Sequence, residues 1–575
     1  MTLLKRTRKE APIQDVEDQL PALLPRYKYL PTPDLTSPKK QDPEEYEWNQ
    51  PFAVHKRIYR QLNHEKGESL MNHFARVVVD LESGGMHPKQ YLLNIAESLT
   101  EMAYRGTSHL RHKLGSLTWG PAVQFAKTMA QTTFASLQVG TLLLVDQVSA
   151  ESFVYGDTLG VGSDELGNFV LCRRHTGEFE DERKATDLPD VELVVKDDAF
   201  WLRLLLFTDM GFAESYMLGE FECDDLTSFF QMFILNREQL NNGTTWFSGF
   251  FSHVAGLARL ANTMENARLN IIRHYDISND MFAAFLSPDM MYSCPIWKHS
   301  INSDTKQEES PRHAQMRKIK YFIEAAKIKP TDHVLEIGTG WGTMAIEAVR
   351  RTGCRVTTIT LSREQKNFAE KRIRAAGFSD KIAVCLLDYR MLPYQKVTYD
   401  KIISCEMIEA VGEKFLATFF SRIDKLLKKD GGIAVFQCIT MPEGRHKGYS
   451  RREDFINHYI FPGGYLPSVT QLINHITTES NGTLIVEKIK NIGPHYVKTL
   501  RLWREAFMDK FDSKIMPALM EEHPNMTEKD IEVFQRKWEY YFAYSEAGFL
   551  TKTLGDVIIT VGREGALELM EGIPL

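Results

Sequence analysis

The stretch VLEIGTGWGTM, at positions 334–344, decides the fold, because an apolar strand there runs directly into a glycine turn that opens a helix. The first glycine, Gly338, permits the sharp turn. Gly340 lets a ligand approach the backbone with no Cβ in the way, and Gly342 lets the helix begin close to the sheet. The pattern predicts a nucleotide at the start of a helix, and a tight strand-to-helix turn without a ligand is the alternative.

The spacing of these glycines favours a particular class of nucleotide. The motif is GxGxG, with Thr343 where the dinucleotide fingerprint GxGxxG would have its third glycine. Glu336, separated from the first glycine by one strand residue, is expected to point into the same pocket and to offset a cationic ligand. S-adenosylmethionine carries two such cations, at its amino group and at its sulfonium, and is the candidate cofactor.

Length and composition limit the class of protein. A chain of 575 residues exceeds one ordinary core and predicts two to four domains. Its 43% hydrophobic and 25% charged residues are typical of a soluble globular protein. The seven cysteines stand singly, without a CxxC pair, so neither a disulfide framework nor a metal site is expected, and a reducing compartment fits best.

The charge and the apolar runs make further predictions about location and partners. A formal net charge of −7 disfavours nucleic-acid binding, which needs a basic surface. We find no apolar run long and pure enough to span a bilayer, and the opening MTLLKRTRKE has too few apolar residues for a secretory signal. A cytoplasmic location is therefore expected.

We expect five parts along the chain, separated by changes in composition. Many prolines and charges in the first part prevent a lasting helix or packed strand there. Short strands mixed with helix typify the third part, where we predict helix 122–137 and strands 141–145, 191–195 and 201–207. The parts are a disordered tail (1–60), a helical extension of unassigned role (61–115), an α+β domain (116–258), a connecting and lid segment (259–300) and an α/β domain (301–575).

After residue 330, short apolar strands alternate with amphipathic helices. This alternation predicts a doubly wound, mostly parallel α/β sheet. The predicted strands are 333–337, 355–360, 382–387, 399–404 and 431–439, and the predicted helices are 341–352, 362–376 and 413–429.

The carboxyl ends of these strands are the expected ligand edge of the sheet. Ser362 and Gln365 form an S-x-x-Q capping box, which predicts where the helix after the second strand begins. Asp388, after the third strand, could accept a hydrogen bond from an adenine amine. Each of these residues has a second interpretation as a cap or turn residue. The residues expected to converge at this edge are Gly338, Thr360, Leu361, Asp388 and Glu409.

Several motifs on either side of the glycine turn resemble one family. Matching segments occur in family order over residues 116 to 565, so the agreement does not depend on one motif. The chain resembles the cyclopropane-fatty-acyl-phospholipid synthases. The matching segments are GFAESYMLGEFECDDL (211–226), HYDISND (274–280), MMYSCPIW (290–297), TLSREQ (360–365), LLDYR (386–390), EMIEAVGEKF (406–415) and DFINHYIFPGGYLPS (454–468).

The resemblance implies a class I methyltransferase that moves a methyl group from S-adenosylmethionine onto the double bond of an acyl chain in a phospholipid. A smaller domain ahead of it would engage the lipid. The implied cofactor pocket comprises Tyr292, Ser293, Glu336, Gly338, Gly340, Gly342, Thr360, Leu361, Gln365, Asp388 and Tyr389. The implied catalytic residues are Cys294, Glu409, Gln437, Ile439 and Tyr496, which in the family surround a bicarbonate ion that serves as the base.

The implied chemistry explains why such a site is needed. An alkene is a poor nucleophile, so the enzyme must hold it in line with the methyl group and exclude water. The resulting cation must lose a proton from the new methyl group to close the ring. Gln437 stands where some members have histidine, and an amide cannot carry charge, which affects anion binding and proton transfer. The aromatic residues suited to stabilise the cation are Tyr275, Tyr292, Phe461, Tyr465 and Tyr496.

Glu409 also has a plainer interpretation. Together with Glu406, it could simply supply acidic residues that open an ordinary helix, a placement that the helix dipole favours.

The alternatives differ in product or in activity. One is a lipid methyltransferase that gives a methyl-branched or methylene product, or that acts on a sphingolipid base. Another is a non-catalytic lipid-binding protein. The expected partner is unsaturated phospholipid at a membrane surface, with a homodimer left open. The uncharged, aromatic segment 239–258 and the basic clusters 425–429 and 445–452 are candidate membrane contacts.

Overall fold

The structure is a computed structural model. It describes residues 119–157, 161–163, 169–171, 188–240, 278–298, 309–394, 397–451 and 453–574. The predictions for residues 1–60 and 61–115, for Tyr275 and for nearly all of the segment 239–258 lie outside these residues.

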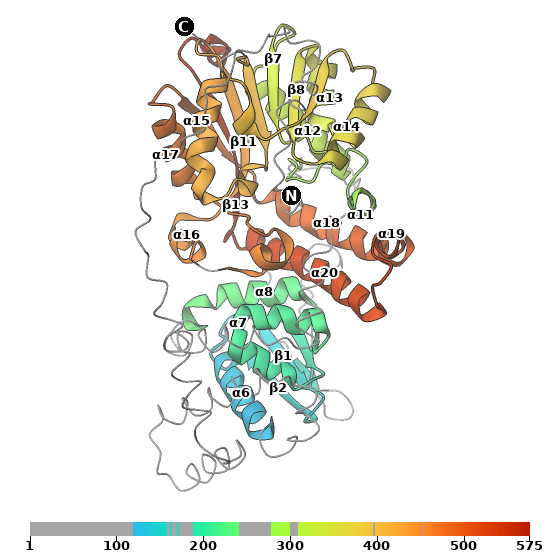
Figure 1. Cartoon of the computed structure of the whole chain (residues 1–575). Helices are drawn as coiled ribbons and strands as arrows, with labels where there is room; N and C mark the ends of the chain where they lie inside the picture. The colour runs from blue at the N-terminus through green and yellow to red at the C-terminus, as the bar shows by residue number, and fades with distance from the viewer. Residues whose placement is uncertain are drawn as a thin grey trace, which may run out of the picture. The chain divides into compact units, whose positions relative to one another are not determined.

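The first described part combines a small mixed sheet with helices (Figure 1). Its strand order is β2-β1-β5-β6, in which β5 runs parallel to β1 while the two outer strands are antiparallel to their neighbours. The predicted strands at 141–145 and 191–195 are confirmed. The elements are α6 (Trp119–Phe134), β1 (Thr141–Asp146), β2 (Glu151–Gly156), β3 (Val161–Ser163), β4 (Phe169–Leu171), β5 (Asp190–Val195), α7 (Ala199–Leu218), β6 (Phe221–Cys223) and α8 (Leu226–Leu235).

The predicted strand at 201–207 is wrong, because these residues belong to helix α7. Short apolar runs do not distinguish a strand from a buried helix. Here residues 201–207 form the first segment of α7, which kinks at Thr208 with φ 51° and ends at Gly219 in a left-handed conformation with φ 76°. The stretch is apolar at nearly every position, so its sequence does not separate one face from the other.

The second part is built on a seven-stranded sheet with the order β12-β13-β11-β10-β7-β8-β9. Strands β7 to β11 run parallel to one another, whereas β13 is antiparallel to both β11 and β12. The predicted doubly wound, mostly parallel sheet is therefore confirmed. The strands are β7 (His333–Ile337), β8 (Arg355–Thr360), β9 (Ile382–Leu386), β10 (Lys401–Cys405), β11 (Ile433–Thr440), β12 (Ile485–Asn491) and β13 (Gly555–Gly562).

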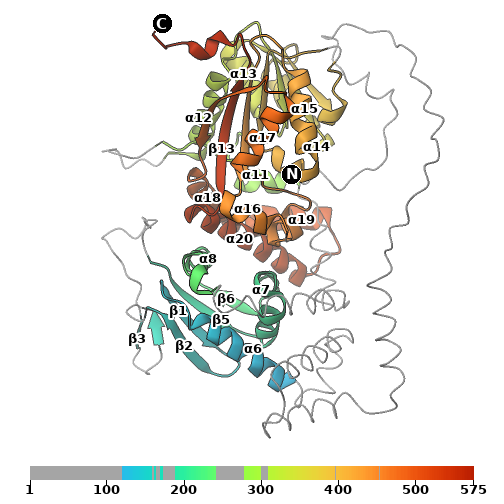
Figure 2. The ribbon, with the colours of Figure 1, turned by 90° about the vertical axis from the view of Figure 1, so that its left-hand side faces the viewer.

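Helices cover both faces of this sheet, with α12 and α17 on opposite sides of the strands in Figure 2. The predicted helix 413–429 is shorter than expected: a single 3₁₀ turn, η4, precedes α15. The helices are α11 (Asn279–Phe285), α12 (Pro311–Ala325), α13 (Thr343–Thr352), α14 (Arg363–Ala375), η2 (Tyr389–Met391), η3 (Ile408–Ala410), η4 (Glu413–Phe415), α15 (Leu416–Leu426), α16 (Glu443–Tyr449), η5 (Ile456–Ile460), α17 (Val469–Glu479), α18 (His495–Asp509), η6 (Phe511–Ile515), α19 (Met516–Glu522), α20 (Glu528–Leu550) and η7 (Leu567–Met570).

An apolar core on one face of the sheet holds the strand ends in register. Side chains of β7, β10 and β11, such as Leu335, Ile402 and Phe436, pack there against α15 residues that include Phe419 and Phe420. Fully burying one such side chain contributes roughly 1.5–3 kcal/mol, so this core fixes where the loops at the strand ends begin. Within the described part of the chain, no helix is long and apolar enough to cross a membrane.

Candidate active site

The glycine turn follows β7 and leaves an open recess. The amide nitrogens of Gly338 and Thr339 both donate to the Ile359 carbonyl, each at 3.0 Å, which ties the turn to β8. Gly340 has φ 51°, and a Cβ built there would meet no atom within 4 Å. At Gly342, by contrast, a Cβ would lie 3.1 Å from the Cβ of Ala369 on α14. Gly340 therefore lines space open to a ligand, while Gly342 allows close helix packing.

Glu336 is buried beside this turn, with 3% of its surface exposed. Burial raises the pKa of its carboxyl group to about 8, although Thr358 lies within hydrogen-bonding reach on the adjacent strand. Its Oε2 atom has no hydrogen-bond partner among the described residues. A buried polar atom without a partner is costly, so a ligand that supplies a donor here would be favoured.

Residues after β8 adopt only part of the predicted capping box. Ser362 caps α14 by accepting a hydrogen bond from the Gln365 amide at 3.1 Å, as predicted. The Gln365 side chain does not return to the cap residue, because its Oε1 accepts from the Thr360 hydroxyl at 2.9 Å. Leu361, between them, is 50% exposed. The hydrogen bond between Thr360 and Gln365 thus holds both side chains in place at the edge of the recess. The exposed side chain of Leu361 can contact a ligand.

Asp388 and Tyr389 follow β9 at the same edge. The Asp388 carboxylate is engaged by Arg390, whose Nε lies 2.9 Å from Oδ1. An adenine contact from this residue stays a prediction, because both carboxylate oxygens already accept from Arg390. Tyr389 packs edge-on against Phe419, with ring centroids 5.3 Å apart, and burial raises its pKa to about 12.

Tyr292 and Ser293 lie on the segment that precedes α12. The Tyr292 ring stacks on Trp503, with centroids 5.1 Å apart, and its hydroxyl is 2.9 Å from that of Tyr541. Ser293 is buried, and its hydroxyl accepts a hydrogen bond from the Lys318 ammonium group. Trp503 was not among the aromatic residues predicted to line the site, although it contacts two of them, Tyr292 and Tyr496.

The predicted catalytic residues Cys294, Gln437 and Tyr496 meet at the carboxylate of Glu406. Its Oε1 accepts from the Cys294 amide at 2.8 Å and from Gln437 Nε2 at 2.6 Å. Its Oε2 accepts from the Tyr496 hydroxyl at 2.5 Å. The prediction had considered Glu406 only as an acidic residue opening a helix, but no helix begins there and the side chain turns inward.

Glu409 and Ile439 form a second contact in the same region. The Ile439 amide donates to Glu409 Oε1 at 2.6 Å, while Oε2 has no partner among the described residues. Burial, followed by the charge of Glu406, raises the pKa of Glu409 to about 8. At neutral pH this carboxyl group is therefore mainly protonated and can donate a proton or a hydrogen bond.

Two further charged residues complete the cluster and were missed by the sequence analysis. Asp556 on β13 is fully buried, accepts from Gln437 Nε2 at 2.8 Å, and has its pKa raised well above the usual range, first by burial and then by Glu406. Lys318 on α12 is also fully buried, and its charge acts to lower the pKa of Glu406. A single acid inside the apolar strand GDVIITVG was a usable signal for Asp556. Lys318 had none, since α12 carries several basic residues.

The cofactor recess and the carboxyl cluster are neighbours at one edge of the sheet. Strands β7, β10 and β11 lie side by side, and the turn after β7 and the loop after β10 leave at their carboxyl ends. Met407, next to Glu406, has its Cβ 3.4 Å from the position that a Cβ of Gly338 would occupy. In the described residues, the open space at Gly340 therefore lies next to the carboxyl cluster, as the ligand-edge rule for such sheets predicts.

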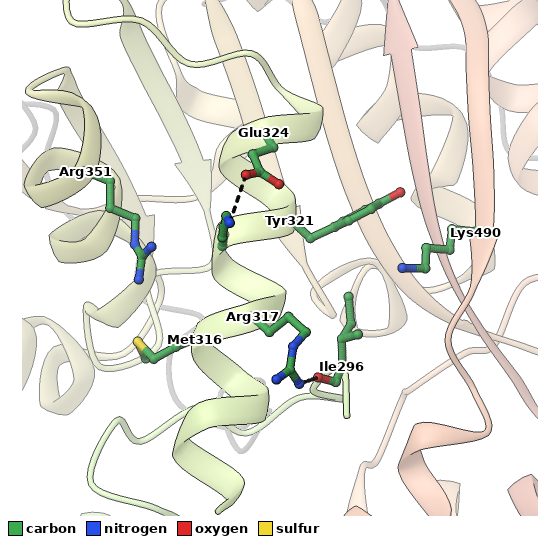
Figure 3. Close-up of a pocket in the computed structure, with 8 residues that line it drawn as sticks. Ile296, Met316, Arg317, Tyr321, Glu324, Arg351 and Lys490 are labelled. Carbon is green, nitrogen blue, oxygen red and sulfur yellow. Dashed lines mark hydrogen bonds and ion pairs between the residues drawn. The ribbon is translucent and has the colours of Figure 1, made fainter. Parts of the chain in front are cut away.

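A separate surface pocket of about 490 Å³ lies along α12 and shares no residue with this cluster (Figure 3). Figure 3 shows Tyr321 and Lys490 pointing toward one another, and the ammonium group lies 4.4 Å from the ring centroid. Arg317 donates to the Ile296 carbonyl at 2.7 Å. None of the charged residues that line this pocket is buried.

The sheet order, the glycine turn after β7 and the recess at Gly340 define a class I S-adenosylmethionine-dependent methyltransferase. The chain belongs to the cyclopropane synthase family, since the model of the family described as mycolic acid cyclopropane synthetase matches residues 262–558. The resemblance seen in the sequence motifs is therefore confirmed, as is the assignment to S-adenosylmethionine-dependent lipid methyltransferases.

This chain covers most of the length of two curated relatives. Tuberculostearic acid methyltransferase UfaA1 of Mycobacterium tuberculosis is 39% identical over 62% of this chain and 79% of that protein. Cyclopropane-fatty-acyl-phospholipid synthase of Escherichia coli is 32% identical over 66% of this chain and 90% of that protein. Among solved structures, the cyclopropane synthase MmaA2 from Mycobacterium tuberculosis is 23% identical and covers 52% of this chain and 98% of its own, with a TM-score of 0.43.

Proposed function

We propose that this enzyme transfers a methyl group from S-adenosylmethionine to the double bond of an unsaturated acyl chain in a phospholipid, and that the product closes to a cyclopropane ring. The observation that carries the proposal is the carboxyl cluster beside the Gly340 recess, in which Glu406 adjoins the buried Glu409 and Asp556. Methylation of an alkene leaves a cation that must lose a proton from carbon, and this step requires an enclosed base.

The recess beside Gly340 suits S-adenosylmethionine because a cationic ligand there would favour the ionised form of Glu336, whose pKa is raised by burial. Gly340 leaves room for close backbone approach, and the unpartnered Oε2 of Glu336 can accept a hydrogen bond. Thr360, Leu361 and Gln365 would hold the nucleoside at the neighbouring strand end. When bound, the cofactor supplies an electrophilic methyl group.

The chain's own residues would orient the alkene and protect the cation. Tyr292 and Tyr496 lie on either side of Trp503, and Tyr496 stacks on Phe549 with centroids 4.5 Å apart. Such a wall excludes water and stabilises a transient cation through the ring quadrupoles. Deprotonation of the new methyl group then delivers the C–H electron pair to the third bond of the ring.

A second product is supported by a specific observation. Gln437 bonds to Glu406 in a site where histidine is found in some members, and one of the best-covered relatives is named for tuberculostearic acid methylation. Loss of a proton from the methyl-bearing chain carbon would give a vinylic methyl product, whereas a hydride shift to the cationic carbon followed by loss of a proton from the methyl group would give a methylene product. A saturated branch would additionally require a reductant. Sphingolipid C9-methyltransferase A of Emericella nidulans, 33% identical over 47% of this chain and 49% of its own length, extends the candidate substrates to a sphingolipid base.

One assay tests the proposal. The full chain is incubated with unsaturated phospholipid vesicles and methyl-labelled S-adenosylmethionine, and the acyl products are fragmented in a mass spectrometer. A ring, a methylene group and a vinylic methyl each add CH₂, so fragmentation must separate them, whereas a saturated branch adds CH₄. Labelled ring product supports the proposal, while vesicles that stay unlabelled with cofactor bound would refute it. Sphingolipid vesicles in a parallel arm identify the other substrate class.

A further inference from the structure

The anion site that the resemblance implies is already filled by a side chain. Bicarbonate would need the donors at Cys294, Gln437 and Tyr496, and all three donate to the carboxylate of Glu406, at 2.8, 2.6 and 2.5 Å respectively. The remaining implied residues are Glu409 and Ile439, and the Ile439 amide donates to Glu409 Oε1 at 2.6 Å. Bicarbonate therefore does not fit this site, because its donors are already occupied.

We propose that the Glu406 carboxylate replaces bicarbonate as the base of the reaction. The inference rests on the proposed function, since it assigns the group that receives the proton there. A carboxylate has the same planar pair of oxygens as bicarbonate and the same charge, so it can use the same donors. Because it is covalently attached, it needs no binding step and its action does not depend on dissolved carbon dioxide.

The backbone at Glu406 indicates that this side chain is held in place by its hydrogen bonds. Its φ of 47° lies in the left-handed region, which a residue with a Cβ adopts at a cost that glycine avoids. Its amide donates to the Gln437 carbonyl at 2.9 Å, so the turn is fixed directly after β10. Three hydrogen bonds to the carboxylate offset that strain.

Burial raises the pKa of Glu406, whereas Lys318 and the donors around its carboxylate act in the opposite direction. Three carboxyl groups this close together cannot all ionise beside one lysine, and the hydrogen bonds favour Glu406 as the one that does. Glu406 accepts three donors, whereas Glu409 Oε2 and Asp556 Oδ1 accept none from the described residues. The other groups that face the cluster, the thiols of Cys294, Cys405 and Cys438 and the Tyr496 hydroxyl, all have raised pKa values and stay neutral.

The proton balance follows from this arrangement. The cationic lipid chain gives up a proton from the new methyl group, whose C–H electron pair becomes the ring bond, and Glu406 becomes a neutral acid. Glu406 is only partly buried, unlike Glu409 and Asp556. It can therefore release the proton to water after the product leaves, and this release restores the carboxylate for the next turnover.

The test compares the full-length wild type with two variants in buffer purged of carbon dioxide, with and without added bicarbonate. We expect the wild-type rate to change by less than about twofold between the two buffers, since the base is part of the chain. Glu406→Gln keeps the size of the side chain and should lower turnover at least about 100-fold with unchanged cofactor affinity. The matched control Glu521→Gln changes an exposed residue on α19 and should have no effect.

Glu406→Gly provides the decisive variant, because glycine suits the left-handed backbone and frees the three donors. We expect it to bind ¹³C-labelled bicarbonate by NMR, which the wild type should not do, and to regain at least about tenfold activity with bicarbonate. A wild type that binds labelled bicarbonate, or whose activity requires it, would overturn the inference. A wild type that methylates no lipid in either buffer would instead refute the proposed function, and the NMR result would still decide the inference.

Discussion

The glycine recess and the carboxyl cluster lie at the same edge of one sheet but are built in different ways. The recess comes mostly from one continuous stretch around Gly338 and Gly340, and its key property is an absence of side-chain atoms. The cluster draws on residues from six separated segments, from Cys294 to Asp556, and its key property is a set of ionisable groups. Binding here depends on free space, whereas the proposed chemistry depends on charge balance.

The largest effect is expected when the recess is filled by a side chain. Gly340→Asp places a side chain in open space and should weaken S-adenosylmethionine binding by more than about 100-fold, because the ligand loses its close backbone contacts. Isothermal calorimetry measures the loss. Gly377→Asp is the control, since this glycine also has a positive φ and open space but lies at the exposed end of α14. Equal losses in both variants would mean that backbone strain, not blocked access, is responsible.

The cluster should instead be broken by removing its cation. Lys318→Met leaves the buried Glu406 charge without compensation and should lower the free energy of unfolding by about 3–5 kcal/mol. Chemical denaturation measures this change. Lys320→Met, on the exposed side of the same helix, should change it by less than about 0.5 kcal/mol. If Lys318→Met changed the free energy of unfolding only slightly, the carboxyl groups of the cluster would have to be neutral when the lysine is absent.

The pH dependence of stability sharpens the comparison by separating the two regions. Glu336 has a folded pKa of about 8, above its unfolded value, so the folded state holds the extra proton and loses stability as the pH rises from about 4.5 to 8. Each such group contributes up to about 1.4 kcal/mol per pH unit. Glu336→Gln should remove the contribution of one group from the slope of unfolding free energy against pH, while the contribution of Glu409 persists. Unfolding curves that stay parallel to those of the wild type would contradict the raised pKa.

Much of the fold could be predicted because it depends on local patterns. Strands β7 and β8 have the predicted bounds, 333–337 and 355–360, and the glycine turn requires residues without a Cβ whatever surrounds them. The strand predicted at 201–207 failed because this part of α7 is apolar at nearly every position, so its sequence carries no helical period. Gln365 failed as a capping partner because its Oε1 accepts from the Thr360 hydroxyl, while the Ser362 amide also donates to Thr360.

The sequence alone predicted the mostly parallel sheet, and the family motifs supplied the residues proposed for the cofactor turn and the reacting end. Only the tertiary structure decided which of them touch, because hydrogen bonds between Glu406, Gln437 and Tyr496 join residues up to 90 positions apart. Burial and the partial charges around each acid likewise arise only when the strands and helices come together. The role of Glu406 therefore became visible only in the folded chain, where its carboxylate lies among the donors expected for an external anion.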